Sequence, residues 1–293
     1  MSFQLSMLRI RARLHEVVKL LIRSDRRHIL HRWRLKQGGV PDLVDPKTFA
    51  EKLQWMKLNL RHPLHVTCSD KLAVRDYVRG SVGAEPLVPL LGVYEDGSDL
   101  PFDLLPDAFV IKASHGSGWV RIVRDKDSID RSQIARECNG WLAQNYWVKK
   151  RERNYQGVPP RLVVEELLLD DSGGVPSDYK IYCFDHGREM VVQVDSNRFQ
   201  GHNRDFFSDD WTRLEIDMIF PRASVAPEKP ESLERALSFA RTLSSPFPFV
   251  RVDFYLLGKR CFVGELTFYP EAGHFLLDPP EVDLQWGEKI PIP

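Results

Sequence analysis

Two carboxylates near the end of the chain have a spacing that suits metal binding. The segments FVRVDFYL (249–256) and CFVGELTF (261–268) are typical of two neighbouring strands in an antiparallel hairpin. With a turn at Gly258-Lys259-Arg260, Asp253 lies directly opposite Glu265 on one face of that hairpin. Opposed carboxylates repel each other unless a cation lies between them, and Mg²⁺ prefers oxygen ligands of this kind. The hairpin therefore predicts a magnesium site at Asp253 and Glu265.

The apolar residues of the same hairpin favour this register. The pairs expected on its core face are Val252 with Leu266, Phe254 with Gly264 and Leu256 with Phe262. A turn one residue shorter pairs Asp253 with Gly264 and turns Glu265 away. That register buries a charge among apolar side chains, which is unfavourable. The alternative without a metal is a solvent-facing carboxylate pair neutralised by Arg251 or Lys259.

A glycine-rich segment after an apolar strand is suited to binding phosphate. In KASHGSGW (112–119), Gly116 and Gly118 let the backbone approach phosphate oxygens, and Lys112 adds positive charge. Ser114 and Ser117 add hydrogen-bond donors. The spacing matches neither a Walker loop nor GxGxxG. The alternative is a flexible Gly-Ser-Gly turn beside a solvent-facing lysine.

Two further strand segments carry charged side chains that could meet a ligand. The period of two in a strand places Asp178 and Lys180 on one face, so Lys180 is available to a ligand. A structural Asp-Lys pair has the same pattern. Glu165, Glu166 and Leu167 end an apolar strand, where a carboxylate and backbone groups could meet a nucleobase and ribose. An ordinary sheet edge is the alternative for this second segment.

The elements that must position these groups are a mixture of helices and strands. The expected strands are 87–94, which is expected to be buried, and 109–114, 161–169, 179–184, 188–196, 249–256 and 261–268. The expected helices start at Asp45 as N-cap with Pro46 first, run from Ser69 to Arg79 closed by Gly80, and include the apolar faces at 134–142 and 233–243. Short turns join neighbouring strands, so an α+β fold is predicted.

The composition indicates a globular protein. Of the 293 residues, 43% are hydrophobic, and 41 basic residues balance 41 acidic ones, so the net charge gives no indication of a nucleic-acid partner. The four cysteines are 40 or more residues apart, which favours buried thiols over a zinc site or disulfides. The sequence shows neither a signal peptide nor a membrane-spanning run, so we expect a cytoplasmic protein.

Residues 1–40 are expected to form a basic helical arm. Residues 1–36 carry ten Lys or Arg residues and two acidic ones, a net charge of +8, and apolar residues from Leu14 to Ile22 recur at helical spacing. Such a stripe either docks on its own protein or contacts an anionic membrane surface or a partner.

Read in order, these segments resemble the ATP-grasp superfamily, most closely its TupA-like branch, which is associated with bacterial surface-polymer and teichuronopeptide biosynthesis. The strings that carry the resemblance cover about residues 41 to 275 and are DPKTFAEKLQWMK, SDKLAVRDYV, LVPLLGVYED, FVIKASHGSGW, VVEELL, DYKIYCFDHG, NRDFFSDDW and VRVDFYLLGKRCFVGELTFYPEAG. The resemblance implies an ATP-grasp fold, in which two α+β subdomains grip ATP. Its expected parts after the arm are an N-terminal α/β region (41–108), a nucleotide-binding subdomain (about 109–168) and a metal-binding subdomain (about 169–293).

The resemblance also implies roles for single residues. Lys112 and Lys180 contact the ATP phosphates beneath the loop at 114–118, Glu165 to Leu167 form the adenine-side hinge, Asp178 contacts the ribose, and Asp253 and Glu265 hold Mg²⁺. Arg198, in DSNRF, is a phosphate or oxyanion partner and, with Lys180, an expected catalytic residue. Thr267 stands where many ATP-grasp enzymes carry Asn, a departure that bears on whether a second Mg²⁺ binds.

The implied reaction joins a carboxylate to an amine through an acyl phosphate. A kinase that stops after phosphorylation, and a nucleotide-binding scaffold without turnover, remain alternatives. The acceptor pocket separates ligase from kinase, and its expected walls are 203–207 and Pro270 to His274. The resemblance further implies a role in surface-polysaccharide or peptide-polymer precursors, with the arm meeting the membrane or a glycan-assembly partner.

Overall fold

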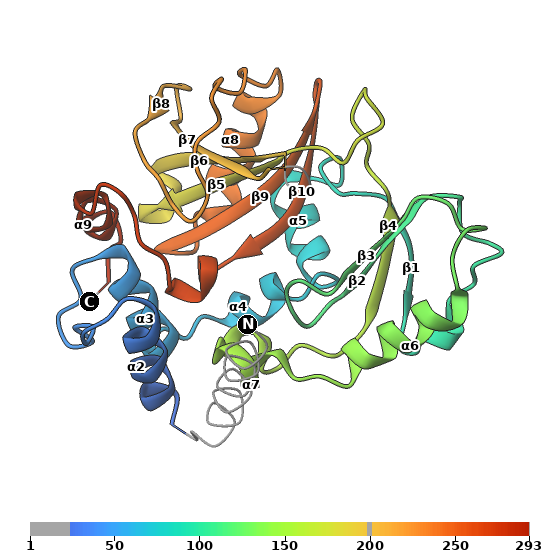
Figure 1. The fold of residues 1–293 in the computed structure, drawn as a ribbon, viewed down its shortest axis with the longest axis horizontal. Coiled ribbons are helices and arrows are strands. Elements are labelled where there is room, and N and C mark those ends of the chain that lie inside the picture. Colours follow the sequence, from blue (N-terminus) through green and yellow to red (C-terminus); the bar gives the residue numbers. More distant parts are fainter. Residues whose placement is uncertain (1–23, 198–200, 293) are drawn as a thin grey trace, which may run out of the picture.

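The computed structural model describes residues 24–197 and 201–292, which form two antiparallel sheets with flanking helices (Figure 1). The small sheet has the order β1-β4-β2-β3, with β1 Leu90–Tyr94, β4 Leu162–Glu166, β2 Phe109–Ala113 and β3 Val120–Val123. The large sheet has the order β10-β9-β5-β6-β7-β8, with β10 Arg260–Thr267, β9 Phe249–Leu257, β5 Asp178–Phe184, β6 Glu189–Ser196, β7 Asn203–Ser208 and β8 Arg213–Leu214. The predicted α+β class is confirmed.

Helices surround both sheets. The α-helices of the described residues are α2 Asp25–Lys36, α3 Phe49–Asn59, α4 Pro63–Ser69, α5 Val74–Val82, α6 Arg131–Leu142, α7 Tyr146–Lys150, α8 Leu233–Ser244 and α9 Glu281–Glu288. Short 3₁₀ turns are η1 Gly97–Asp99, η2 Arg153–Tyr155, η3 Asp185–Gly187 and η4 Pro270–Gly273. Helix α6 covers the small sheet with Ile134, Cys138 and Trp141, and α8 packs on β9 and β5 of the large sheet.

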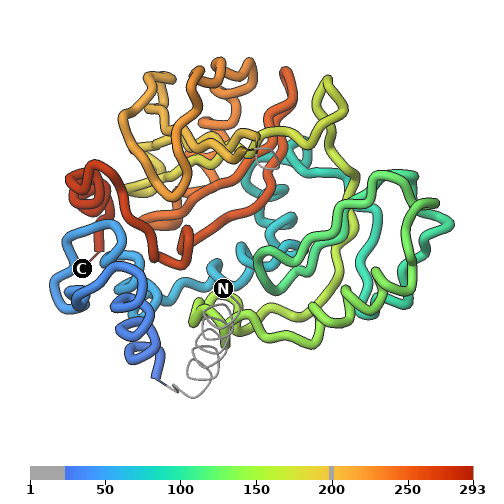
Figure 2. The backbone as a smooth tube through the Cα atoms, in the orientation of Figure 1, coloured from blue at the N-terminus to red at the C-terminus, as the bar shows by residue number. Residues whose placement is uncertain are grey.

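Helices from the early and late parts of the chain, α3 and α9, pack together against the core of the large sheet. Helix α3 packs against α9, and the ring of Phe49 lies 5.5 Å from that of Trp286 and 4.9 Å from that of Phe249. Figure 2 shows the early blue segment and the late red segment side by side at this edge of the molecule. Burial of such aromatic clusters contributes much of the stability of a domain this size. The large sheet is therefore a rigid base for side chains on its other face.

Two helix boundaries differ from the expectation. Helix α3 begins after Thr48, which forms a capping box with Glu51, rather than at Asp45 and Pro46. The helix expected from Ser69 to Arg79 is interrupted by an extended Asp70, so α4 ends at Ser69, and α5 runs to Val82 and is closed by Gly83 instead of Gly80. The break at Asp70 matters for the site, because it directs Lys71 towards the small sheet.

Strand β1 is not the buried strand that was expected. It lies at the edge of the small sheet and, among the described residues of that sheet, pairs only with β4, so Leu90 and Leu91 remain exposed. The other expected strands are present with small shifts of their ends. The division of the chain at residues 40, 108 and 168 stays a prediction.

The arm is only partly described. Its apolar stripe from Leu14 to Ile22 lies outside the described residues, whereas α2 packs Ile29 and Trp33 into the body. Within residues 24–197 and 201–292, no helix is long and apolar enough to cross a membrane. All four cysteines are free and buried, as the sequence indicates.

Candidate active site

The β9–β10 hairpin brings Asp253 and Glu265 opposite each other, but by a different route from the expected one. Its turn has two residues, Gly258-Lys259, because Leu257 pairs with Arg260. A bulge at Gly264 then shifts the register by one residue, so that Asp253 pairs with Glu265. A side chain at Gly264 would place its Cβ 3.3 Å from the Asp253 carbonyl oxygen, so glycine suits the bulge.

The expected apolar pairs of the hairpin are therefore partly wrong. Phe254 pairs with Val263 rather than Gly264, and Leu256 pairs with Cys261 rather than Phe262. Twisted hairpins favour two-residue turns, and Gly258 supplies the positive φ of 55° that such a turn needs. Because the bulge shifts the register by one residue, the hairpin can have a two-residue turn and still keep an apolar core face. The pairs beyond it, including Val252 with Leu266, are as expected.

A cavity of about 630 Å³ lies between the two sheets and collects most of the expected site. The small sheet lines it from β2, β3 and the end of β4, and the large sheet from β5, β9 and β10. Expected site residues that line it are Lys112, Ser117, Gly118, Glu166, Leu167, Asp178, Lys180, Asp253 and Glu265. Apolar walls come from Val88, Val110, Val120, Ile122, Leu168 and Val175. The cavity has the size and mixed lining of a small-molecule site.

Three lysines enter this cavity from different elements. Lys112 of β2 pairs with Glu165 at 2.6 Å, and Lys180 of β5 lies 3.4 Å from both Asp178 and Asp253. Lys71, which follows the break after α4, lies 3.9 Å from Glu265. Burial lowers the pKa of Lys71. Burial also acts to lower the pKa of Lys112, but the surrounding acidic groups, Glu165 first among them, together raise it. The cations converge where a polyanion such as a phosphate chain can be held.

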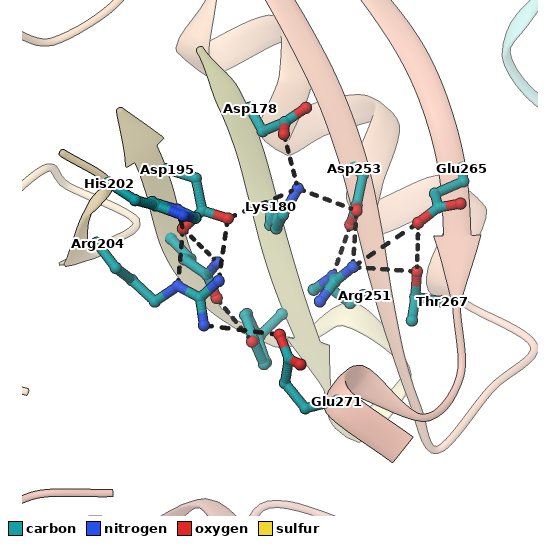
Figure 3. A network of polar contacts seen from close by, with 12 residues as sticks. Asp178, Lys180, Asp195, His202, Arg204, Arg251, Asp253, Glu265, Thr267 and Glu271 are labelled. Carbon is teal, nitrogen blue, oxygen red and sulfur yellow. Dashed lines mark hydrogen bonds and ion pairs between the residues drawn. The ribbon is translucent and has the colours of Figure 1, made fainter. Parts of the chain in front are cut away.

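Positive groups also compensate the two opposed carboxylates (Figure 3). Arg251 donates two 2.7 Å hydrogen bonds to Asp253, from Nε to Oδ1 and from Nη2 to Oδ2. Glu265 lies 3.9 Å from Arg251 and accepts a hydrogen bond from the Thr267 hydroxyl at 3.2 Å. Burial raises the pKa of Glu265, but Lys71 and Arg251 outweigh it and hold that pKa below its usual value. The lowered pKa of Glu265 favours the charged form that metal binding requires.

Three expected site residues have structural contacts and do not line the cavity. The Ser114 hydroxyl donates to the Pro159 carbonyl and accepts from the Arg161 amide. The Gly116 carbonyl accepts from Lys71 Nζ at 2.5 Å, and its Cα packs against Trp119. Glu165 is buried between Arg75 and Lys112, at 2.8 and 2.6 Å. Glu165 therefore orients Lys112. Arg198 lies outside the described residues.

A family model described as TupA-like ATPgrasp matches residues 51–291. The chain belongs to the TupA-like ATP-grasp family. This confirms the family predicted from the sequence. A sequence search of the curated proteins finds no match.

Solved structures that match this chain do so at low identity. D-alanine-D-alanine ligase from Helicobacter pylori is 14% identical with a TM-score of 0.49, over 84% of this chain and 70% of that one. D-alanine-D-alanine ligase from Bacillus anthracis complexed with ATP is 16% identical with a TM-score of 0.42, over 76% and 63%. N5-carboxyaminoimidazole ribonucleotide synthetase from Thermus thermophilus is 11% identical with a TM-score of 0.40, over 75% and 51%. The chain thus spans about half the length of that synthetase.

Several residues in or beside the cavity of this TupA-like protein were missed in the sequence. Lys71 lies in the string SDKLAVRDYV, and the Asp70 before it, a helix-breaking signal, could have pointed to it. Arg251 was considered only as a neutralising neighbour, although its position two residues before Asp253 puts both on one strand face. Arg121 and Tyr255 also line the cavity, and no local pattern marks them.

The TupA-like chain has a polar network that continues from the cavity along the large sheet (Figure 3). Lys180 lies 4.0 Å from Asp195, which accepts hydrogen bonds from Arg204 at 2.7 and 3.2 Å. His202 lies 3.3 Å from the same carboxylate, and Arg204 lies 3.7 Å from Glu271 of η4. The network connects the cavity to both segments expected to form the acceptor walls, 203–207 and Pro270 to His274.

Proposed function

We propose that this protein is a Mg·ATP-dependent carboxylate–amine ligase that forms an amide through an acyl phosphate. The observation that carries the proposal is the convergence of Lys71, Lys112 and Lys180 with the Asp253–Glu265 pair in one cavity between two sheets. Cations for the phosphates and carboxylates for a metal are the groups that phosphoryl transfer needs.

The donor set of the carboxylate pair fits Mg²⁺. Among the described residues no group of three or more His, Cys, Asp and Glu side chains is arranged to hold a metal by itself. Mg²⁺ commonly takes one or two protein carboxylates and completes its shell with phosphate and water. Asp253 and Glu265 would hold it, with Thr267 beside Glu265. When bound, Mg²⁺ supplies charge neutralisation at the phosphates.

The protein's own residues would bind and orient the nucleotide. Lys112 and Lys180 would contact the phosphates, with Lys71 as a third cation. Glu166 and Leu167, at the end of β4, would contact the adenine. Asp178 lines the cavity where a ribose hydroxyl could donate to it. Ser117 and Gly118 line the cavity, and their segment would cover the phosphates and keep water from the acyl phosphate.

The reaction follows from these positions. A carboxylate oxygen of the substrate attacks the γ-phosphorus, the bond to ADP breaks, and the lysines stabilise the negative charge of the transferring group. The amine then attacks the acyl carbon and phosphate leaves. Arg198 stays a proposed phosphate partner. We further propose, from the family alone, that the substrate is a surface-polysaccharide or peptide-polymer precursor and that residues 1–36 contact a membrane or assembly partner.

The decisive experiment supplies the protein and Mg·ATP with fractionated extracts of the producing cell and follows the products by mass spectrometry. A ligase gives ADP, phosphate and an amide product. A phosphorylated product that accumulates would replace the ligase by a kinase. ADP release without either product, or no nucleotide use at all, would reject the proposal.

A further inference from the structure

The solvent side of helix α2 is basic. Arg26, Arg27 and Arg34 are exposed, and their spacing places them within about 100° of the helix circumference. The buried residues of the helix lie on its other side and pack into the body. The acidic residue of this helix, Asp25, is among them. The exposed charges of α2 are therefore all positive.

A second basic segment, formed by α7 and the turn after it, lies against the start of this helix. Arg153 Nε lies 2.7 Å and Arg151 Nη1 3.7 Å from the buried Asp25 carboxylate, so ion pairs join the two segments. Figure 1 shows α7 and the start of α2 along the same lower edge of the molecule. Lys149 and Arg153 are exposed, whereas the acidic residue of this segment, Glu152, is buried. The exposed charges of the second segment are thus positive as well.

Together the two segments form one basic surface. Helix α2 and residues 146–153 contain nine Lys or Arg residues and two acidic ones, and both acidic side chains are buried. Residues 1–23, which precede α2 in the sequence, add five basic residues and one acidic residue. A surface whose exposed charges have one sign attracts a partner of the opposite sign. The exposed residues that define the basic surface are Arg26, Arg27, Arg34, Lys149 and Arg153.

Apolar groups beside the basic surface favour a lipid bilayer over a soluble polyanion. Leu30 lies between the arginines on the solvent side of α2 and is half-buried, and Leu35 is 51% exposed. The sequence of residues 1–23, which joins α2 at Ser24, also mixes basic residues with apolar ones. A soluble polyanion offers charge alone, whereas the interface of an anionic bilayer accepts basic and apolar groups together.

We propose that the basic surface docks on the anionic lipid headgroups of a membrane. This deepens the contact proposed above for residues 1–36, because it names lipid as the partner and adds α7 to the surface. The docked surface lies beside the cavity. The ring of Tyr146, in α7, lies 5.6 Å from that of Trp119, and the loop before Trp119 lines the cavity with Ser117 and Gly118. A precursor held at the membrane would thus be presented next to the cavity.

Vesicle binding tests the proposal without nucleotide turnover, so its failure would leave the ligase function untouched. The full chain is sedimented with phosphatidylcholine vesicles that contain or lack phosphatidylglycerol, at low and at high salt. Glutamine is a good helix former, so it can replace exposed arginines of α2 without loss of the fold. The test variant is Arg26→Gln/Arg27→Gln/Arg34→Gln. The matched control, which removes three exposed positive charges elsewhere, is Lys229→Gln/Lys259→Gln/Arg260→Gln.

Each Lys or Arg near an anionic bilayer strengthens binding about fivefold, so the test variant should bind phosphatidylglycerol vesicles about 100-fold more weakly than the unaltered protein. The control should bind as the unaltered protein does, and high salt should weaken the binding of both. Equal binding to neutral vesicles, equal loss in the two variants, or full binding by the test variant would overturn the proposal. Binding to dextran sulfate that the test variant loses, without binding to vesicles, would replace the membrane by a soluble polyanion.

Discussion

Lys71→Met tests the residue that the structure adds to the nucleotide site. The lysine lines the cavity with Lys112 and Lys180, lies 3.9 Å from Glu265, and holds the Gly116 carbonyl at 2.5 Å. Methionine keeps the length and the apolar part of the side chain and removes only the charge and the donors. We expect weaker Mg·ATP binding with little change in the stability of the free protein, because the desolvation cost of the buried charge disappears together with its contacts.

The size of the effect follows from the contact that is lost. A hydrogen bond from a charged donor contributes about 1.5–3 kcal/mol, which raises Kd by roughly 10- to 150-fold. At a Mg·ATP concentration about a hundredfold above the original Kd, the unaltered protein gains about 2.7 kcal/mol. The variant then gains only about 0.3–1.4 kcal/mol. With roughly 2 °C per kcal/mol for a chain of this size, the shift in Tm falls from about 5 °C to about 1–3 °C.

The assay is thermal unfolding with and without Mg·ATP, supported by calorimetric titration of the nucleotide. Lys229→Met is the control, because Lys229 is an exposed lysine whose ion pair with Glu234 lies on the surface. That control should keep the full Tm shift. A Lys71→Met protein that binds Mg·ATP as tightly as the control would refute the placement of Lys71 at the phosphates. Equal loss in both variants would show that general surface charge governs binding.

Three further predictions follow from the same contacts. Lys112→Met and Lys180→Met should each weaken Mg·ATP binding in titrations while circular dichroism remains native; normal binding by either variant would return that lysine to a structural role. Asp253→Asn should abolish most metal-dependent ADP release and also lower the Tm of the free protein, because the buried Arg251 loses its two hydrogen bonds to a charged acceptor; an unchanged Tm would contradict this reading. Glu152→Gln should raise the Tm by an amount that grows from pH 4.5 to about pH 7. Burial raises the folded-state pKa of Glu152 from 4.5 to about 7, so the unaltered protein loses stability as pH rises between these values and no further above them; a difference in Tm that does not depend on pH would reject the raised pKa.

Much of the site could be predicted from local patterns. A strand alternates its faces whatever its neighbours are, so Asp178 and Lys180 share a face in the structure as expected. The apolar runs also placed most strands, because their burial is encoded in short segments. The pairing of Asp253 with Glu265 followed from the need to keep apolar residues on the core side.

That same hairpin shows where the pattern of one segment was insufficient. The sequence required Asp253 and Glu265 on one face, but it did not reveal whether the turn or a bulge absorbs the extra residue. Both solutions satisfy the apolar pattern near the metal pair. Twisted strands prefer a two-residue turn, so the extra residue lies in a bulge at Gly264 and not in the turn.

Tertiary contacts decided the remaining assignments, since they join residues that are far apart in the chain. Glu165 was expected to meet the nucleotide, yet Arg75, 90 residues earlier, pairs with it and leaves it to orient Lys112. Lys71 became a site residue only because α4 ends next to β10, which brings it to Glu265. Glu152 has basic neighbours on both sides in the sequence and would be read as paired. In the folded chain Arg151 and Arg153 lie beside Asp25, and the Glu152 carboxylate is instead buried where the charges of Lys57, Lys150 and Arg32 act on it.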